Sequence, residues 1–462
     1  MAVDPNKPQT TYFTTILERI SYGGYFVGQN IHYIFVISFL MLFLTDYRFM
    51  NPAAVGMIFL VARIWDAVND PLFGVIVDKA ELKGGKFKPW VKISTFLIPI
   101  AVILMFAMPE GLSDNAKFSY AMATYILFGM CYTVCDVPIF ALATAMTNVI
   151  QERTLIISVG RFAASIAMVF LSIVTMPIIQ ALGWLNSAIV LSAAAFILMF
   201  PINIFAKERF RNEKSESASI KDILSYLIGN KYLLILYLGN IIASATSTGM
   251  TVNPYVAKYM LGGEHMIPAT MLTLFGPMIV ITFFIPLLTQ KIDKFHLYII
   301  GVISNIIFSV IGYFAGYTNI PLFFALAVIR GISYSITMTM MFLFAADCVE
   351  YGQYKTGKRA EGITFSIQTF STKMLGAMSA ALAAMLMNAV GYDGSLAEQA
   401  PHTMSGLWQT YLLFPVIGLV LCLPVLRMYR LRDKYVQIMA QCNSSELSRE
   451  EAEKLIPKNV VP

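Results

Sequence analysis

The stretch "ARIWDAVNDPLFGVIVDK", residues 62–79, carries two aspartates four residues apart between runs of apolar side chains. Asp66, Asn69 and Asp70 stand at positions i, i+3 and i+4, so a helix presents them on one face, which Arg63 extends by three residues. An ionisable side chain in a membrane-spanning helix costs about 2.5–3.5 kcal/mol at its centre and is a candidate for function. Two carboxylates this close in a medium of low dielectric need a proton, a bound cation or a basic partner.

The composition of the chain is that of a membrane protein. Of its 462 residues 57% are hydrophobic and 13% are charged, with a mean hydropathy of +0.68, whereas a soluble domain has roughly 25% charged residues. A spanning helix needs about 20 apolar residues. By that measure we expect twelve spans, at 25–46, 52–78, 89–108, 118–149, 155–181, 185–205, 231–260, 267–290, 297–316, 320–347, 362–390 and 407–430.

The distribution of charge predicts the orientation of these spans. Lysines and arginines gather in alternate loops, such as "DKAELKGGKFKPWVK" and "KERFRNEKSESASIKD", while the other loops are poor in them. Basic loops face the cytoplasm, so we expect a multi-pass protein of the cytoplasmic (plasma) membrane with both termini inside. The net charge of +6 therefore does not indicate nucleic acid, although basic clusters that bind anionic substrates are the alternative.

One polar segment divides the spans into two sets of six. The sequence predicts an N-terminal six-helix half (1–206), a cytoplasmic central loop (207–230), a C-terminal six-helix half (231–432) and a short cytoplasmic tail (433–462). This is the architecture of major-facilitator-type carriers, all-α proteins whose substrate site lies between the halves near the middle of the membrane. No nucleophile elbow, zinc-protease motif or phosphate-binding loop occurs, so we expect no enzyme and no cofactor beyond a coupling ion.

The fourth predicted span repeats the pattern of polar groups seen in the second. In "CYTVCDVPIF" Thr133 lies one turn before Asp136, and prolines follow the acidic turns at Pro71 and Pro138. Proline frees a backbone carbonyl inside a helix. Carboxylates, a hydroxyl and carbonyls form an all-oxygen cluster, which suits a hard monovalent cation better than a transition metal. In the alternative interpretation, Asp66 and Asp70 only pair with basic residues, Arg63 and Lys373, to hold helices together.

Four motifs in this order resemble one family of transporters. "RIWDAVNDPLFG", "GGKFKPW", "YTVCDVP" and "ADCVEYGQYKTGKRAEGITFSIQT" are similar to segments of the glycoside–pentoside–hexuronide:cation symporters, the melibiose permease family. The resemblance runs from about residue 21 to the twelfth span. It implies a major-facilitator fold and uptake of a sugar or glycoside driven by sodium, proton or lithium.

The resemblance also implies roles for individual residues. The cation site would contain Asp66, Asn69, Asp70, Thr133 and Asp136, with sodium at the three aspartates. The substrate site would contain Gln29, Asn30, Asp136, Phe140, Arg161, Gln368, Thr369 and Lys373. The residues that gate rather than bind would be Arg63, Asp347, Glu350, Arg359 and Glu361.

Three of these positions depart from the melibiose carrier. It has Lys-Asp where this chain has Gln29 and Asn30, and a tryptophan where this chain has Phe140. The loss of one carboxylate leaves Arg161 less neutralised, and an unpaired charge in a water-poor site is expensive. The substitutions argue against a galactoside and favour a glycoside that carries a carboxylate, such as a hexuronide.

We therefore expect a monomeric carrier that couples a sugar or glycoside to Na⁺ or H⁺ by alternating access. A lysolipid-type symporter of the same fold is one alternative, which the polar residues Gln29, Asn30, Arg161 and Gln368 disfavour. A membrane receptor or scaffold that does not transport is the other, and it predicts ligand binding without cation dependence.

Overall fold

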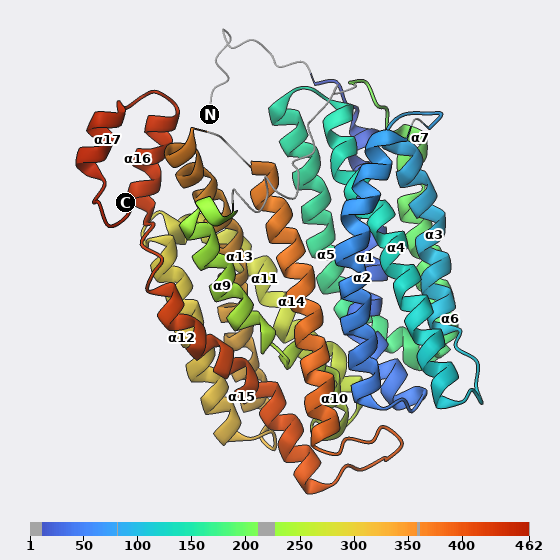
Figure 1. Cartoon of the computed structure of the whole chain (residues 1–462). Coiled ribbons are helices and arrows are strands. Elements are labelled where there is room, and N and C mark those ends of the chain that lie inside the picture. Colours follow the sequence, from blue (N-terminus) through green and yellow to red (C-terminus); the bar gives the residue numbers. More distant parts are fainter. Residues whose placement is uncertain (1–11, 81, 211–226, 358–360, 462) are drawn as a thin grey trace.

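The computed structural model describes residues 12–80, 82–210, 227–357 and 361–461, which fold as helices joined by short connections (Figure 1). The helices are α1 (Ile16–Leu42), the π-helix η1 (Phe43–Tyr47), α2 (Pro52–Lys79), α3 (Lys88–Phe106), α4 (Asp114–Met146), α5 (Ile150–Leu182), α6 (Trp184–Met199), α7 (Pro201–Phe205), α9 (Lys231–Ala245), α10 (Gly249–Met260), the short η2 (Glu264–Met266), α11 (Ile267–Thr289), α12 (Lys294–Ala315), α13 (Ile320–Thr356), α14 (Glu361–Ala389), α15 (Pro401–Leu426), α16 (Asp433–Asn443) and α17 (Arg449–Leu455).

The helices form two groups that stand side by side in Figure 1. We call α1–α7 the N-terminal group and α9–α15 the C-terminal group. The groups meet where α2 packs against α14 and α5 against α11. At Gly56 on α2 an added Cβ would lie 2.7 Å from the Ala384 Cβ and 3.1 Å from the Ala381 carbonyl oxygen. A side chain there would therefore force α2 and α14 apart.

The all-helical membrane fold predicted from the sequence is confirmed. Within the described residues, eleven helical stretches are long and apolar enough to cross a membrane. The predicted span 362–390 coincides with α14, of which Met374–Ala389 forms a shorter apolar stretch.

Two predicted spans differ in detail. The expected span 231–260 is interrupted, because α9 ends at Ala245 and α10 begins at Gly249. Ser and Thr side chains compete with helical hydrogen bonds, and the Thr248 hydroxyl in the break donates to the Thr410 carbonyl at 2.5 Å. The first helix begins at Ile16 rather than at residue 25. Its charged first turn is compensated, since Glu18 accepts hydrogen bonds from Arg209 at 2.7 and 3.0 Å.

The end of the bundle where α16 and α17 lie, at the top of Figure 1, is the tail end. Here Glu208 accepts hydrogen bonds from the backbone N–H groups of Lys86, Phe87 and Lys88 at 2.7, 2.7 and 2.5 Å. The first N–H groups of a helix have no partner within it, so this carboxylate completes the start of α3. The connection after the N-terminal group is thus attached to that group.

Candidate functional site

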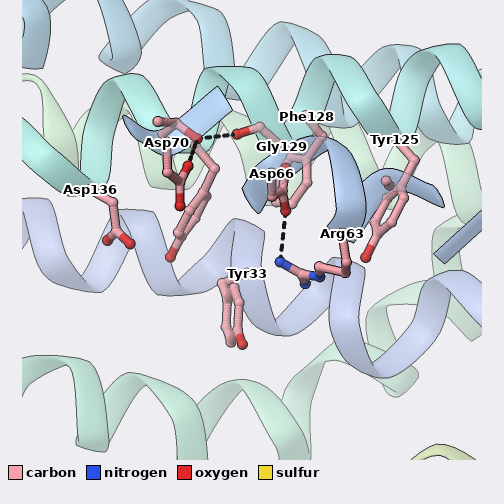
Figure 2. A pocket seen from close by; sticks show the side chains of 11 residues that line it. Tyr33, Arg63, Asp66, Asp70, Tyr125, Phe128, Gly129 and Asp136 are labelled. Carbon is pink, nitrogen blue, oxygen red and sulfur yellow. Dashed lines mark hydrogen bonds and ion pairs between the residues drawn. The ribbon is translucent and has the colours of Figure 1, made fainter. Parts of the chain in front are cut away.

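The acidic residues predicted on two separate spans line one cavity. Asp66 and Asp70 of α2 and Thr133 and Asp136 of α4 bound a space of about 200 Å³. Figure 2 shows the three aspartates projecting from their two helices, with Tyr33 of α1 opposite. The polar residues of the two helices meet because α2 packs against α4 and because each pair is three or four residues apart on its helix. The helical spacing thus brings the polar groups of distant segments to one place.

Asp66 is paired with a base from its own helix. Arg63 Nη1 donates to Asp66 Oδ2 at 3.0 Å, and both side chains are largely buried. The opposite side of the carboxylate lies against Gly129 of α4, where an added Cβ would be 2.6 Å from Asp66 Oδ1. A side chain at this position would therefore require the Asp66 carboxylate to shift. The alternative interpretation predicted that Asp66 and Asp70 pair with Arg63 and Lys373. The pair of Asp66 with Arg63 is present, whereas the side chain of Lys373 lies outside the described part of the chain.

Thr133 links the second acidic residue to α4. Its hydroxyl lies 2.6 Å from Asp70 Oδ1 and 3.1 Å from the Gly129 carbonyl oxygen. A hydroxyl has one proton to donate, and the carboxylate is the closer acceptor. Asn69 Nδ2 donates to Thr133 Oγ1 at 3.1 Å. Asn69, Asp70 and Thr133 thus form one connected set of oxygen and amide groups between α2 and α4.

Asp136 is held from the first helix. Gln29 Nε2 donates to Asp136 Oδ1 at 3.0 Å, and only 2% of Gln29 is exposed. The other end of this amide, Oε1, is buried and accepts no hydrogen bond from the described residues. A buried acceptor without a donor costs about 1–3 kcal/mol. A hydroxyl donor from a ligand would remove that cost.

The three carboxylates do not converge on one point. Among the described residues, no three histidine, cysteine or acidic side chains are placed to hold a metal ion together. Arg63, Thr133 and Gln29 each contact a different carboxylate. The sodium site at Asp66, Asp70 and Asp136 therefore stays a prediction, and this structure shows its residues around one cavity with separate partners.

The predicted substrate residues lie partly beside this cavity. Arg161 of α5 is exposed, and its guanidinium carbon lies 5.5 Å from the centre of the Phe140 ring. Phe140 also packs edge-on against Phe26 of α1, with the ring centres 5.4 Å apart. Asn30 Nδ2 donates to the Phe26 carbonyl at 2.8 Å. Arg161 forms no ion pair with any described residue.

Of the substrate residues predicted on the C-terminal group, the structure describes the side chain of one. Gln368 of α14 is 3% exposed, and its Oε1 is a second buried amide oxygen without a donor in the described ranges. The side chains of Thr369 and Lys373 lie outside those ranges.

The predicted gating residues fall in two places. Asp347 and Glu350 of α13 lie at the tail end, where Lys294 Nζ is 2.5 Å from Asp347 Oδ1 and Asn443 Nδ2 donates to Glu350 Oε2 at 2.9 Å. Arg63 instead lines the cavity. Arg359 and the side chain of Glu361 are outside the described residues.

The sequence reasoning missed the aromatic wall of the cavity. Tyr33, Tyr125, Phe128 and Tyr132 line it together with Gly129, and the rings of Tyr33 and Tyr132 are 5.7 Å apart. The signal was available, because Tyr125, Gly129, Tyr132 and Asp136 recur at helical spacing on one face of α4. Aromatic residues are common in membrane helices, so this spacing does not distinguish those that line a cavity from those that pack between helices.

Comparison with known proteins places the chain in a family. Residues 21–433 match the family described as MFS/sugar transport protein. The chain is 30% identical over 439 residues to the uncharacterized symporter YnaJ of Bacillus subtilis (strain 168), covering 92% of this chain and 94% of that protein. It is 26% identical over 428 residues to the isoprimeverose transporter of Lactiplantibacillus pentosus, covering 89% and 88%. Among solved structures, that of a D-xylose–proton symporter has the same fold, with a TM-score of 0.64 at 13% identity, covering 89% and 96%.

These matches confirm the resemblance seen in the motifs. The chain belongs to the MFS/sugar transport family of glycoside–pentoside–hexuronide symporters. It is a multi-pass membrane transporter of the major-facilitator fold and not an enzyme.

Proposed function

We propose that this chain carries a sugar or glycoside across the plasma membrane together with a monovalent cation, sodium or proton, by alternating access. The observation that carries the proposal is the cavity in which Asp66, Asp70 and Asp136 each contact a different partner. A family of sugar symporters gives the substrate class, and relatives named as isoprimeverose and glucuronide carriers are consistent with it.

The cation is proposed to bind between α2 and α4. Asp70 and Asp136, which line the cavity together with Thr133, are proposed as its carboxylate ligands, whereas Asp66 is paired with Arg63. Their oxygens and the Thr133 hydroxyl are ligands that suit a hard monovalent ion. Thr133 Oγ1 lies 2.6 Å from Asp70 Oδ1, so one ion would contact both oxygens, and Asp136 lines the same cavity.

The sugar is proposed to bind next to the cation, and Gln29 is the residue that couples them. Its amide N–H holds Asp136 in this structure, while its carbonyl oxygen has no donor among the described residues. A cation on Asp136 releases the amide N–H for a sugar hydroxyl, and the carbonyl oxygen accepts from another. Phe140 offers an apolar face for the ring, and Gln368 of the other group offers a second buried oxygen that has no donor among the described residues.

The membrane potential is sufficient to drive this transport. One charge that crosses 100 mV gains about 2.3 kcal/mol, and 1.4 kcal/mol is a tenfold ratio. A single cation therefore supports roughly fortyfold accumulation of a neutral sugar.

We further propose that the tail end faces the cytoplasm. Among the described residues, Lys86 and Lys88 of one basic stretch, Arg209 of another, and Lys294 lie at this end of the bundle. Cytoplasmic loops of membrane proteins are enriched in lysine and arginine. The structure then corresponds to a carrier whose opposite end, which faces outward, is closed.

Uptake into vesicles tests the transport proposal. Purified protein in liposomes is given a labelled methyl glycoside under an inward sodium gradient, under an inward proton gradient, and under neither. Accumulation that requires one of the two gradients supports symport. Equal, non-accumulating uptake under all three conditions contradicts it, and no uptake of any glycoside leaves binding to a receptor or scaffold as the better account.

Competition for binding tests the substrate class. Arg161 is exposed beside Phe140 without an acidic partner in the described residues, and Asn30 brings no charge. We propose that methyl glucuronide competes better than methyl xyloside and methyl galactoside at matched concentrations. If the galactoside competes best by about tenfold, 1.4 kcal/mol or more, the charge argument is wrong.

A further inference from the structure

The end of the bundle opposite the tail end, which we call the closed end, is joined by a short segment of the N-terminal group. Thr45, Asp46 and Tyr47 are consecutive residues of the π-helix η1 that follows α1. Each of the three side chains contacts a polar side chain of the C-terminal group. A π-helical turn is rare and occurs frequently at functional sites, and here it turns three neighbouring side chains toward the facing group.

Asp46 is the centre of these contacts. Its side chain is fully buried. Lys258 Nζ and the Tyr259 hydroxyl donate to Oδ2 at 2.7 and 3.0 Å, and the Tyr392 hydroxyl donates to Oδ1 at 2.6 Å. All three donors belong to the C-terminal group. A buried carboxylate is tolerated only when it is paired and hydrogen-bonded, so the burial of Asp46 favours contact between the groups.

The neighbours of Asp46 add two further contacts between the groups. The Tyr47 hydroxyl lies 2.8 Å from both carboxylate oxygens of Glu264, and Thr45 Oγ1 lies 2.8 Å from the Tyr255 hydroxyl. The backbone also comes close, because an added Cβ at Gly394 would lie 2.3 Å from the Thr45 carbonyl oxygen. The closed end therefore leaves no space for a side chain at Gly394.

We propose that Asp46, with its three donors Lys258, Tyr259 and Tyr392, is a latch that holds the carrier shut toward the outside and sets how often that side opens. The proposal rests on the proposed function in one respect: alternating access supplies the reason for this end to open. Burial raises the pKa of the Tyr392 phenol, which keeps this hydroxyl protonated and able to donate.

The cluster can separate without leaving a charged side chain without hydrogen-bond partners. Lys258 Nζ also lies 3.1 Å from Glu264 Oε1, and the Tyr259 and Tyr392 hydroxyls lie 3.1 Å apart, all within the C-terminal group. Asp46 keeps the Thr45 hydroxyl at 2.7 Å within its own group. When the groups part and water enters, each retains part of its hydrogen bonding. The latch is thus strong when closed and reversible.

Spin labels across the closed end test the latch. Cysteines are introduced at Asn115, at the start of α4, and at Glu398, between α14 and α15, both exposed. Cys442, the native cysteine that is not buried, is replaced by serine. Pulsed electron resonance then measures the distance distribution in the full chain. We expect one dominant short distance with the native latch, and Asp46→Asn to raise the population of a longer distance about tenfold.

Two further variants keep the test decisive. Tyr392→Phe removes one donor and preserves the ring, so it shifts the same population in the same direction by less. Glu110→Gln changes an exposed carboxylate paired with Arg48 within the N-terminal group and leaves the distribution unchanged. An unaltered distribution in Asp46→Asn, or in Tyr392→Phe if Asp46→Asn does not fold, overturns the latch.

The measurement needs neither sugar nor cation. A shifted distribution in a protein that takes up no glycoside supports the latch and contradicts only the proposed function. Uptake with an unshifted distribution contradicts only the latch.

Discussion

The two ends of the helix bundle differ in which groups their charged side chains join. At the closed end Asp46 of the N-terminal group is bonded to Lys258, Tyr259 and Tyr392 of the C-terminal group. At the tail end the ion pairs of the described residues stay within one group. Arg19 pairs with Glu152, Arg209 with Glu18, and Lys294 with Asp347.

This difference determines which movement is expensive. Separation at the closed end exchanges the three hydrogen bonds of a buried carboxylate for bonds to water, and a hydrogen bond to a charged group contributes about 1.5–3 kcal/mol net. Separation at the tail end leaves its described ion pairs intact, because both members move together. Opening of the closed end therefore has a free-energy barrier. At the tail end, each group can move as a rigid body without breaking its described ion pairs.

The largest effect is expected in the cavity between the two ends. Asp70→Asn keeps the size of the side chain and removes one charge, so we expect cation-stimulated uptake to fall by roughly 100-fold, about 2.7 kcal/mol, while some sugar binding remains. The closed-end distance distribution without cation stays unchanged. Asp114→Asn, on the exposed start of α4, is the matched control. Full sodium- or proton-driven uptake by Asp70→Asn would show that the carboxylate is structural.

A change at the tail end should alter stability and leave the distance across the closed end alone. Lys294→Met removes the partner of Asp347 and of Asp433, at 2.5 and 3.3 Å. The site is partly exposed, so we expect a loss of about 2 kcal/mol in the free energy of unfolding, less than for a fully buried pair. Thermal unfolding measures the loss, with Arg449→Met in the exposed pair on α17 as a control. A changed closed-end distance in Lys294→Met would break the contrast between the ends.

A smaller effect is expected from the close contact behind Asp66. Gly129→Ala places a Cβ 2.6 Å from Asp66 Oδ1, which must shift the carboxylate away from α4. Such overpacking costs about 1–3 kcal/mol, and we expect the cation affinity to fall about tenfold. Gly74→Ala on α2, which has nothing within 4 Å of the added Cβ, leaves the affinity unchanged. Equal cation affinities of the two variants would show that Asp66 does not contribute to the cation site.

The smallest effect is expected from an exposed hydrogen bond at the closed end, which tests whether burial of the contact matters. Asn51 Nδ2 donates to Asn388 Oδ1 at 2.8 Å, also between the groups, but this bond is exposed. Water replaces such a bond. Asn51→Ala should therefore change the free-energy difference between the short-distance and long-distance populations by less than about 0.5 kcal/mol. A shift as large as that of Asp46→Asn would mean that any contact between the groups serves as a latch.

The parts of the site that follow helical periodicity could be predicted from the sequence. Asp66 and Asp70, like Thr133 and Asp136, are three or four residues apart, so their shared faces follow once the spans are recognised. Their meeting in one cavity required only that α2 packs against α4. The aromatic wall had the same periodicity, but tyrosine and phenylalanine occur throughout these helices.

The latch could not be predicted because its contacts are long-range. Asp46 stands at the end of the first predicted span, where an acidic residue is ordinary, and its partner Lys258 lies 212 residues further along the chain. The π-helical turn that aims Asp46 at the other group has no sequence pattern of its own. The need for glycine at 129 likewise depends on where Asp66 lies, which the sequence of α4 alone does not show.

The central claim is that sugar and cation bind cooperatively around Asp70 and Asp136. Calorimetry on the purified protein measures sugar affinity with and without the cation, and cation affinity with and without the sugar. Coupling between two sites is reciprocal, so the account predicts that each ligand raises the affinity of the other by the same factor, and that Asp70→Asn brings this factor to one. A sugar affinity that is identical at all sodium concentrations and all pH values would contradict it.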